Sequence, residues 1–158
     1  MPQADPFRRA LLAALLLLAG RGAAAADTPA DTPADATAAV RQALMAAFDK
    51  PEARLQVAPV VVVGDAALAG WTQADRGGRA LLRRRGADWR VAACGGDGLK
   101  DPALLRDTGV PPASADALVR QLTAAEARLP AAQRARFSSF DGLLRMDAGA
   151  PHPPAHRH

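Results

Sequence analysis

The histidines are the most distinctive chemical group of this chain, because all three lie in its last seven positions. They are His152, His156 and His158, in a proline-rich segment that is not expected to pack. Neutral imidazole binds copper, zinc and nickel, and the nearby thioether of Met146 adds a preference for Cu(I). The sequence therefore predicts a copper-binding tail. The alternative is a frayed terminus whose histidines have no function.

Cys94 is the second candidate ligand and the only cysteine of the chain. Without a second cysteine it is a buried thiol, one half of an intermolecular disulfide, or a metal ligand. The glycine-rich residues 95–98 that follow it could turn the backbone sharply and leave a thiolate accessible, whereas free cysteines are commonly buried. Burial and a ligand role both stay open. Cysteine protease chemistry is disfavoured, because a nucleophile needs a fixed histidine base and every histidine lies on the tail.

The N-terminus has the three parts of a secretory signal peptide. Arg8 and Arg9 form the positive region, residues 10–20 are apolar, and residues 24–26 supply a small-residue cleavage pattern. An apolar run of this length spans about half of a hydrocarbon core roughly 30 Å thick, which argues against a membrane anchor. We therefore predict a signal peptide over residues 1–26, a periplasmic location, and no stable membrane insertion after cleavage.

The rest of the chain is predicted to be one domain between two polar segments. Residues 27–36 contain a repeated Asp-Thr-Pro-Ala, which predicts a flexible linker. Residues 37–145 are predicted to form a single domain, and residues 146–158 a flexible His/Pro-rich tail. A length of 158 residues fits one domain and excludes a multidomain enzyme.

The first elements of this domain are a helix and four strands. Helical spacing from Thr37 places four apolar residues on one face, namely Val40, Leu44, Ala47 and Phe48, and Pro51 ends the helix. Strands are expected at residues 55–63, 66–73, 79–85 and 89–94, with a turn at residues 75–78. The short connections predict an antiparallel meander. Strict alternation in the last strand would put Trp89, Val91 and Ala93 on one face, and Cys94 on the other.

Helical spacing returns after the strands. It predicts helices at residues 102–107, from Pro112 to about Leu129, and at residues 131–139, followed by a short extended piece at Leu143-Leu144. This order predicts an α+β fold: an N-terminal helix, a four-stranded antiparallel meander, and C-terminal helices packed on one sheet face. The core is expected to depend on a few large residues, namely Phe48, Trp71, Trp89 and Phe137, with the two tryptophans in the core or at its rim.

The arginines of the third and fourth predicted strands form a basic run that could bind an anionic surface. They are Arg76, Arg79, Arg83, Arg84, Arg85 and Arg90. A solvated sheet face is the preferred interpretation, because no Phe or Tyr is interleaved for base stacking. Loss of residues 1–26 would also lower the formal net charge from +4 to +2. We therefore predict no nucleic-acid partner.

Several short motifs resemble those of one protein family. They are FDKPEARL at residues 48–55, AGW at 69–71, GGRALLR at 77–83, CGGD at 94–97, and RMD at 145–147 before a His-containing tail. Together they resemble the copper uptake system-associated proteins, small exported proteins of proteobacteria, over most of the chain from Val40 onward. This resemblance implies an exported, non-enzymatic accessory of copper acquisition or handling. It implies no particular ligands, which rest on soft-ligand chemistry alone.

Two hypotheses follow for the function. In the first, a periplasmic accessory captures copper with its His/Met tail, with or without Cys94, and passes it to a copper transporter, receptor or chaperone. In the second, the protein is a metal-independent interaction domain that docks a partner through its sheet or its arginine-rich hairpin. An enzyme is disfavoured, because the sequence contains no recognisable fixed acid/base pair.

Overall fold

The computed structural model describes residues 32–146, so the predicted signal peptide, the first half of the predicted linker and the three histidines lie outside the described residues. The helices are α1 (Pro33–Phe48), a short 3-10 helix η1 (Asp97–Lys100), α2 (Pro102–Asp107), α3 (Pro112–Glu126) and α4 (Ala131–Phe137). The strands are β1 (Leu55–Val63), β2 (Ala66–Gln73), β3 (Arg76–Arg85), β4 (Asp88–Gly95) and β5 (Leu143–Arg145).

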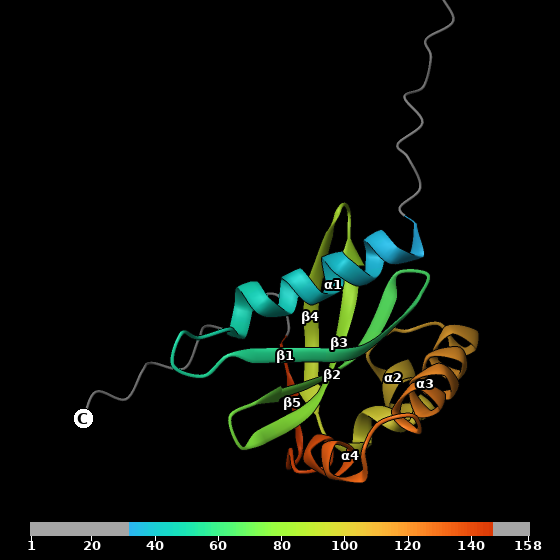
Figure 1. Ribbon diagram of the computed structural model, residues 1–158. Coiled ribbons are helices and arrows are strands. Elements are labelled where there is room, and N and C mark those ends of the chain that lie inside the picture. The colour runs from blue at the N-terminus through green and yellow to red at the C-terminus, as the bar shows by residue number, and fades with distance from the viewer. Residues whose placement is uncertain (1–31, 147–158) are drawn as a thin grey trace, which may run out of the picture. The chain divides into compact units, whose positions relative to one another are not determined.

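The strands form one antiparallel sheet in the order β1-β2-β3-β4-β5 (Figure 1). The α+β fold with an antiparallel meander is therefore confirmed. The predicted extended piece at Leu143-Leu144 pairs with β4 and makes a fifth strand.

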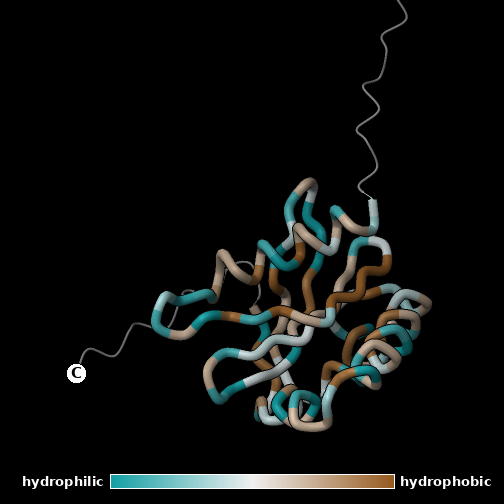
Figure 2. Tube along the Cα trace, viewed as in Figure 1, coloured by the Kyte–Doolittle hydropathy of each residue, from teal (hydrophilic) through white to brown (hydrophobic). Residues whose placement is uncertain are grey.

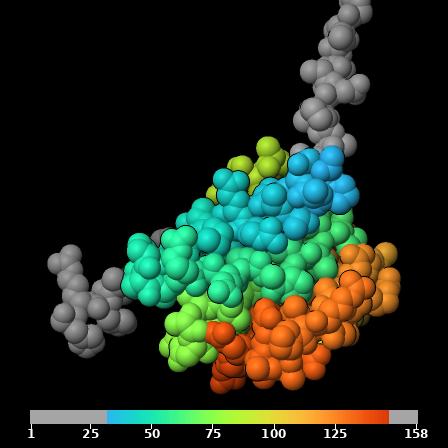
Figure 3. Space-filling view, in the orientation of Figure 1, coloured from blue at the N-terminus to red at the C-terminus, as the bar shows by residue number. Residues whose placement is uncertain are grey.

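Helices cover both faces of this sheet. Packing under α1 involves alternate residues of the strands, such as Ala67, Ala69 and Leu82. The intervening residues, such as Leu68 and Leu81, pack against α2 and α3. In Figure 2 hydrophobic residues gather along the central strands, and Figure 3 shows α1 and α3 on either side of β1. The C-terminal helices thus pack on one face, as expected, while α1 covers the opposite one.

The first helix begins four residues before the predicted Thr37, inside the predicted linker. Thr32 is its N-cap: the Thr32 side chain accepts a hydrogen bond from the Asp35 backbone N–H at 3.1 Å, and the Asp35 carboxylate accepts one from the Thr32 backbone N–H. Pro33 occupies the first turn, where its missing N–H costs nothing. The segment from Thr32 to Asp35 is therefore a capping box and helix start. On the helix, Val40 and Leu44 are buried as predicted, whereas Ala47 is exposed.

The glycines predicted to form a turn at residues 75–78 lie within β3 instead. The turn is formed by Ala74 and Asp75, and Ala74 adopts a positive φ of 51°. A Cβ on Gly77 would lie 2.7 Å from the Arg136 carbonyl oxygen, and one on Gly78 would lie 2.8 Å from the Trp71 ring. These glycines therefore serve close packing of α4 and Trp71 on the sheet rather than a change of chain direction.

A buried ion pair joins β3 to α3. The Arg79 guanidinium donates to both carboxylate oxygens of Glu126, at 2.7 and 2.8 Å, and both side chains are almost fully buried. Glu126 lies one helical turn after Leu122 on the buried face of α3. The prediction of a solvated arginine face was therefore wrong at Arg79, because its charge is matched by a distant acid that local pattern does not reveal.

No helix among residues 32–146 is both long enough and apolar enough to span a membrane.

Candidate functional site

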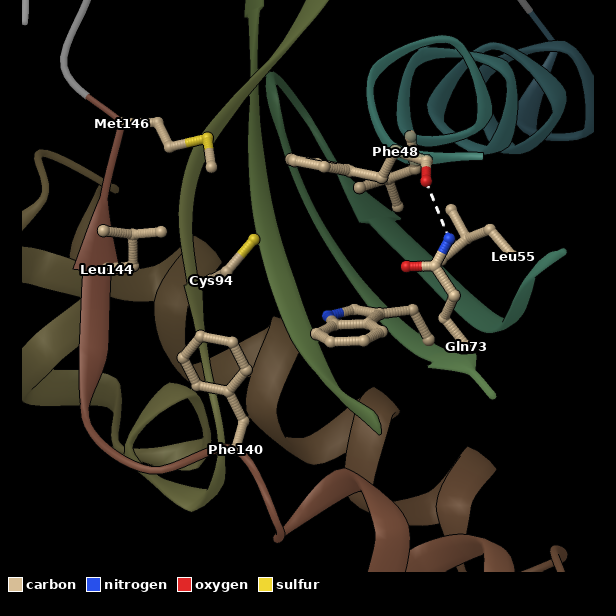
Figure 4. Close-up of a pocket in the computed structure, with 9 residues that line it drawn as sticks. Phe48, Leu55, Gln73, Cys94, Phe140, Leu144 and Met146 are labelled. Atoms are coloured by element: carbon tan, nitrogen blue, oxygen red, sulfur yellow. Dashed lines mark hydrogen bonds between the residues drawn. The ribbon is translucent and has the colours of Figure 1, made fainter. Parts of the chain in front are cut away.

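An apolar cavity of about 140 Å³ lies between α1 and the sheet. Its walls come from α1, from β1, β2 and β4, and from the C-terminal segment that includes β5; they are Leu44, Phe48, Leu55, Trp71, Gln73, Cys94, Phe140, Leu144 and Met146. Trp71 and Phe140 meet edge to face with ring centroids 5.9 Å apart. Two of the residues that the sequence singled out as ligands, Cys94 and Met146, therefore line one cavity (Figure 4).

Cys94 reaches this cavity because of an irregularity in β4. Leu81 of β3 pairs with Ala93, but the next residue, Leu82, pairs with Val91, so Ala92 is an extra residue in the ladder. Such a bulge reverses the alternation of faces along the strand. The predicted faces were therefore wrong: Cys94 lies on the α1 side with Trp89 and Val91, while Ala93 packs on the α3 side.

Close packing after Cys94 buries the thiol. Gly95 and Gly96 are themselves buried, and a Cβ on Gly96 would collide with the Phe140 carbonyl oxygen. The missing side chains let the segment around Phe140 lie against this end of the sheet. Cys94 is only 5% exposed, so of the states left open for this residue the structure shows a buried thiol, and the glycines do not leave it open to solvent.

Burial also controls the chemistry of this thiol. Loss of solvation raises the pKa of Cys94 from 9.0 to about 11, because the cavity disfavours an isolated thiolate. At neutral pH the side chain is therefore a protonated thiol and a poor nucleophile.

Met146 is held beside Cys94 by the fifth strand. Leu144 of β5 pairs with Cys94, and the Met146 backbone N–H donates to the Ala92 carbonyl at 2.7 Å. Cys94 and Met146 direct their sulfur atoms toward the same space, opposite Phe48 (Figure 4). A thiol and a thioether separated by fifty-one residues of sequence are thus brought together by one short strand pairing.

The polar side chain of Gln73 in the cavity wall is already engaged, and the Trp71 indole N–H is a donor that cannot ligate a metal. The Gln73 amide donates to the carbonyl oxygens of Phe48 and Ala53, both at 2.8 Å, which ties the end of α1 and the following loop to β2. The sulfur atoms are therefore the wall's available groups for a soft metal ion.

The remaining predicted ligands, His152, His156 and His158, lie outside the described residues. Within residues 32–146 no three His, Cys, Asp or Glu side chains gather into a group that could hold a metal ion. The thiol and thioether pair is the part of the predicted ligand set that the described structure brings together.

Sequence reasoning missed the aromatic and aliphatic walls of this cavity. Phe48 was expected in the core and Trp71 in the core or at its rim; both are half-buried and line the cavity, whereas Trp89 and Phe137 are buried as expected. The sequence held one usable signal for these walls, because Leu144 belongs to the predicted extended piece and Phe140 lies just before it. Pairing of that piece with the strand of Cys94 would have placed them correctly.

Alkaline pH is expected to destabilise the protein through Cys94. Between pH 9 and pH 11 the unfolded thiol ionises while the folded thiol keeps its proton, so the free energy of unfolding should fall by about 2–3 kcal/mol as the pH rises from about 8 to about 11. Urea denaturation across this range measures the effect. Cys94→Ala is the control, because it keeps every other titrating group. Equal pH dependence in the two proteins would show that the thiol is not desolvated.

No protein-family model matches the chain, and no curated protein or solved structure is significantly similar to it.

Proposed function

We propose that this protein is an exported accessory of copper handling that binds Cu(I) through Cys94 and Met146, with the tail histidines as further ligands. The observation that carries the proposal is the presence of a thiol and a thioether in one apolar cavity. Soft sulfur ligands favour Cu(I) over harder ions. The resemblance of the sequence motifs to copper uptake system-associated proteins supports the same assignment.

The apolar walls suit a neutral copper complex. Binding of Cu(I) to Cys94 forms the Cu–S bond and releases the thiol proton, and no electron is transferred. The thiolate and the cuprous ion cancel in charge, so the complex has a smaller desolvation cost than either ion alone. Walls that disfavour an isolated thiolate therefore tolerate a copper thiolate, to which Met146 adds a neutral second ligand.

Transfer would use the tail. His152 follows Met146 by six residues, which reach about 20 Å at full extension, so the histidines are within range of the cavity along the chain. Ligands on separate segments can be replaced one at a time by those of an acceptor. We propose a periplasmic copper transporter, receptor or chaperone as that acceptor, and a binding role without catalysis.

Replacement of Cys94 by serine is expected to weaken Cu(I) binding by about 100-fold or more, because loss of a ligand costs at least as much as loss of a group that supports one. Met146→Leu should weaken binding by about 10-fold, since a neutral thioether is the weaker ligand. The affinity is measured by anaerobic competition with a chromophoric Cu(I) chelator. Met45→Leu is the matched control, because Met45 packs in the same core but does not line the cavity.

The same titration separates the alternatives when a chain ending at Ala150 is included. If truncation abolishes binding while Cys94→Ser and Met146→Leu bind normally, copper is bound by the tail alone and the cavity site is wrong. If the unmodified protein binds neither Cu(I) nor Cu(II), the copper function is wrong, and the metal-independent interaction domain becomes the better description.

A further inference from the structure

A second pocket, of about 210 Å³, is lined by four arginines from three strands. We name it the arginine pocket; its basic residues are Arg83 and Arg85 of β3, Arg90 of β4 and Arg145 of β5. The C-terminal end of α2 closes one side through Asp107 and Thr108. These arginines are distant in sequence, so the sheet itself gathers the positive charge.

Strand register explains this concentration of charge. Arg83 and Arg90 are directly opposite each other in the β3–β4 ladder, and Arg145 is opposite Ala93 of the same β4 strand. Like charges in directly opposed positions destabilise a sheet. The arrangement is therefore unfavourable for folding by itself, and a bound anion would relieve the repulsion.

Few acidic side chains within residues 32–146 neutralise the charge of the arginine pocket. Asp107 is the single acid of the pocket wall and forms no ion pair in the described part of the chain. Arg90 contacts Asp88 at 3.5 Å, but both side chains are about 70% exposed, so this pair contributes little. Arg85 and Arg145 have no ion pair or hydrogen-bonding side-chain partner among the described residues.

Arg83 adds a buried donor to the arginine pocket. Its Nη1 donates to the Thr108 carbonyl at 3.2 Å, which fixes the guanidinium against the end of α2. Its Nε is buried and has no hydrogen-bond partner in the described residues. A buried N–H without an acceptor has a desolvation cost, which an anion oxygen in the pocket could offset.

We propose that the arginine pocket binds a small oxyanion with two or more negative charges, of the phosphate or dicarboxylate class. Guanidinium groups present planar pairs of donors that match these oxygens. A cavity of about 150 Å³ holds a molecule the size of benzene, so this volume accommodates one such anion. Four arginines against one aspartate leave an excess of positive charge for a multivalent ligand. The proposal does not depend on copper binding.

Inorganic phosphate and succinate, added separately to the metal-free protein, test this site. Either anion should raise the melting temperature, and calorimetry should give saturable binding to one site. Arg85→Gln with Arg90→Gln should weaken that binding by about 10- to 100-fold, through loss of charge-assisted hydrogen bonds. Arg120→Gln with Arg128→Gln is the matched control, because it removes the same charge from exposed positions on and just after α3.

The comparison of the two anions identifies the ligand class: stronger binding of phosphate points to a phosphoryl group, and stronger binding of succinate to a dicarboxylate. Absence of saturable binding by both anions at millimolar concentration overturns the proposal. Equal weakening of anion binding by the two double variants also overturns the proposal, since binding would then depend on the net charge of the protein and not on the arginine pocket. Tighter binding of an acidic peptide than of either anion would instead identify a protein-docking surface.

Discussion

Glu126→Leu is expected to lower the free energy of unfolding by about 3–5 kcal/mol, because it leaves the Arg79 guanidinium buried without its main partner. The side chains of Arg79 and Glu126 are 2% and 3% exposed, and two short hydrogen bonds join them. Water cannot replace the lost carboxylate at this depth. Urea or guanidinium denaturation followed by circular dichroism measures the loss.

Two further variants show whether the loss of stability in Glu126→Leu comes from the unpaired Arg79 charge or from altered packing. Asp97→Ala removes the exposed carboxylate that contacts the same guanidinium at 3.0 Å, and it should cost less than about 1 kcal/mol. Arg79→Met combined with Glu126→Leu should recover most of the stability, since it removes both buried charges together. A double variant as unstable as Glu126→Leu would attribute the loss to the packing of α3.

Phe137→Ala is the second large effect, with an expected loss of about 3–5 kcal/mol. Phe137 is fully buried at the end of α4, and its ring fills the space over Gly70, where a Cβ would lie 2.8 Å from ring atom Cζ. The Arg79 guanidinium lies 5.7 Å from the ring centroid. Truncation would open a cavity between α4 and the sheet and remove this contact. Thermal and chemical unfolding both measure the loss.

Phe140→Ala is the matched control for Phe137→Ala. Phe140 is half-buried and borders the Cys94 cavity, so its truncation removes less apolar burial and should cost about 1–2 kcal/mol. A comparable loss in both variants would show that packing around α4 does not depend on complete burial of Phe137. Because Phe137 and Arg79 are in contact, Phe137→Ala and Glu126→Leu should not be additive.

The two proposed sites lie on either side of the C-terminal strand. Leu144 of β5 faces the cavity of Cys94, while Arg145 lines the arginine pocket. Met146 contributes to the walls of both. Alternation along an extended strand sends successive side chains to opposite faces, so three residues connect the two sites. A variant of Arg145 should therefore affect the anion site while sparing the thiol.

The sequence by itself determined the element order and the chemical types of the candidate ligands. Periodicity and turn residues depend on near neighbours, so they predicted the presence and order of α1, the meander strands and the C-terminal helices, although α1 and β3 begin earlier than predicted. Cys94 and Met146 were recognisable as soft ligands from their side chains alone. The start of α1 is also encoded locally, in the Thr32 capping box. It was predicted to be linker because it lies in the repeated Asp-Thr-Pro-Ala segment.

Only the tertiary structure decided which of these residues meet. Because of the bulge at Ala92, Cys94 lies on the sheet face under α1. The pairing of β5 with β4 places Met146 at the same cavity. A bulge depends on pairing with the neighbouring strand, and one inserted residue reverses every face assignment beyond it. The burial of Arg79 likewise required Glu126, forty-seven positions away. Local pattern cannot reveal these long-range partners, and here they determine both the core and the candidate sites.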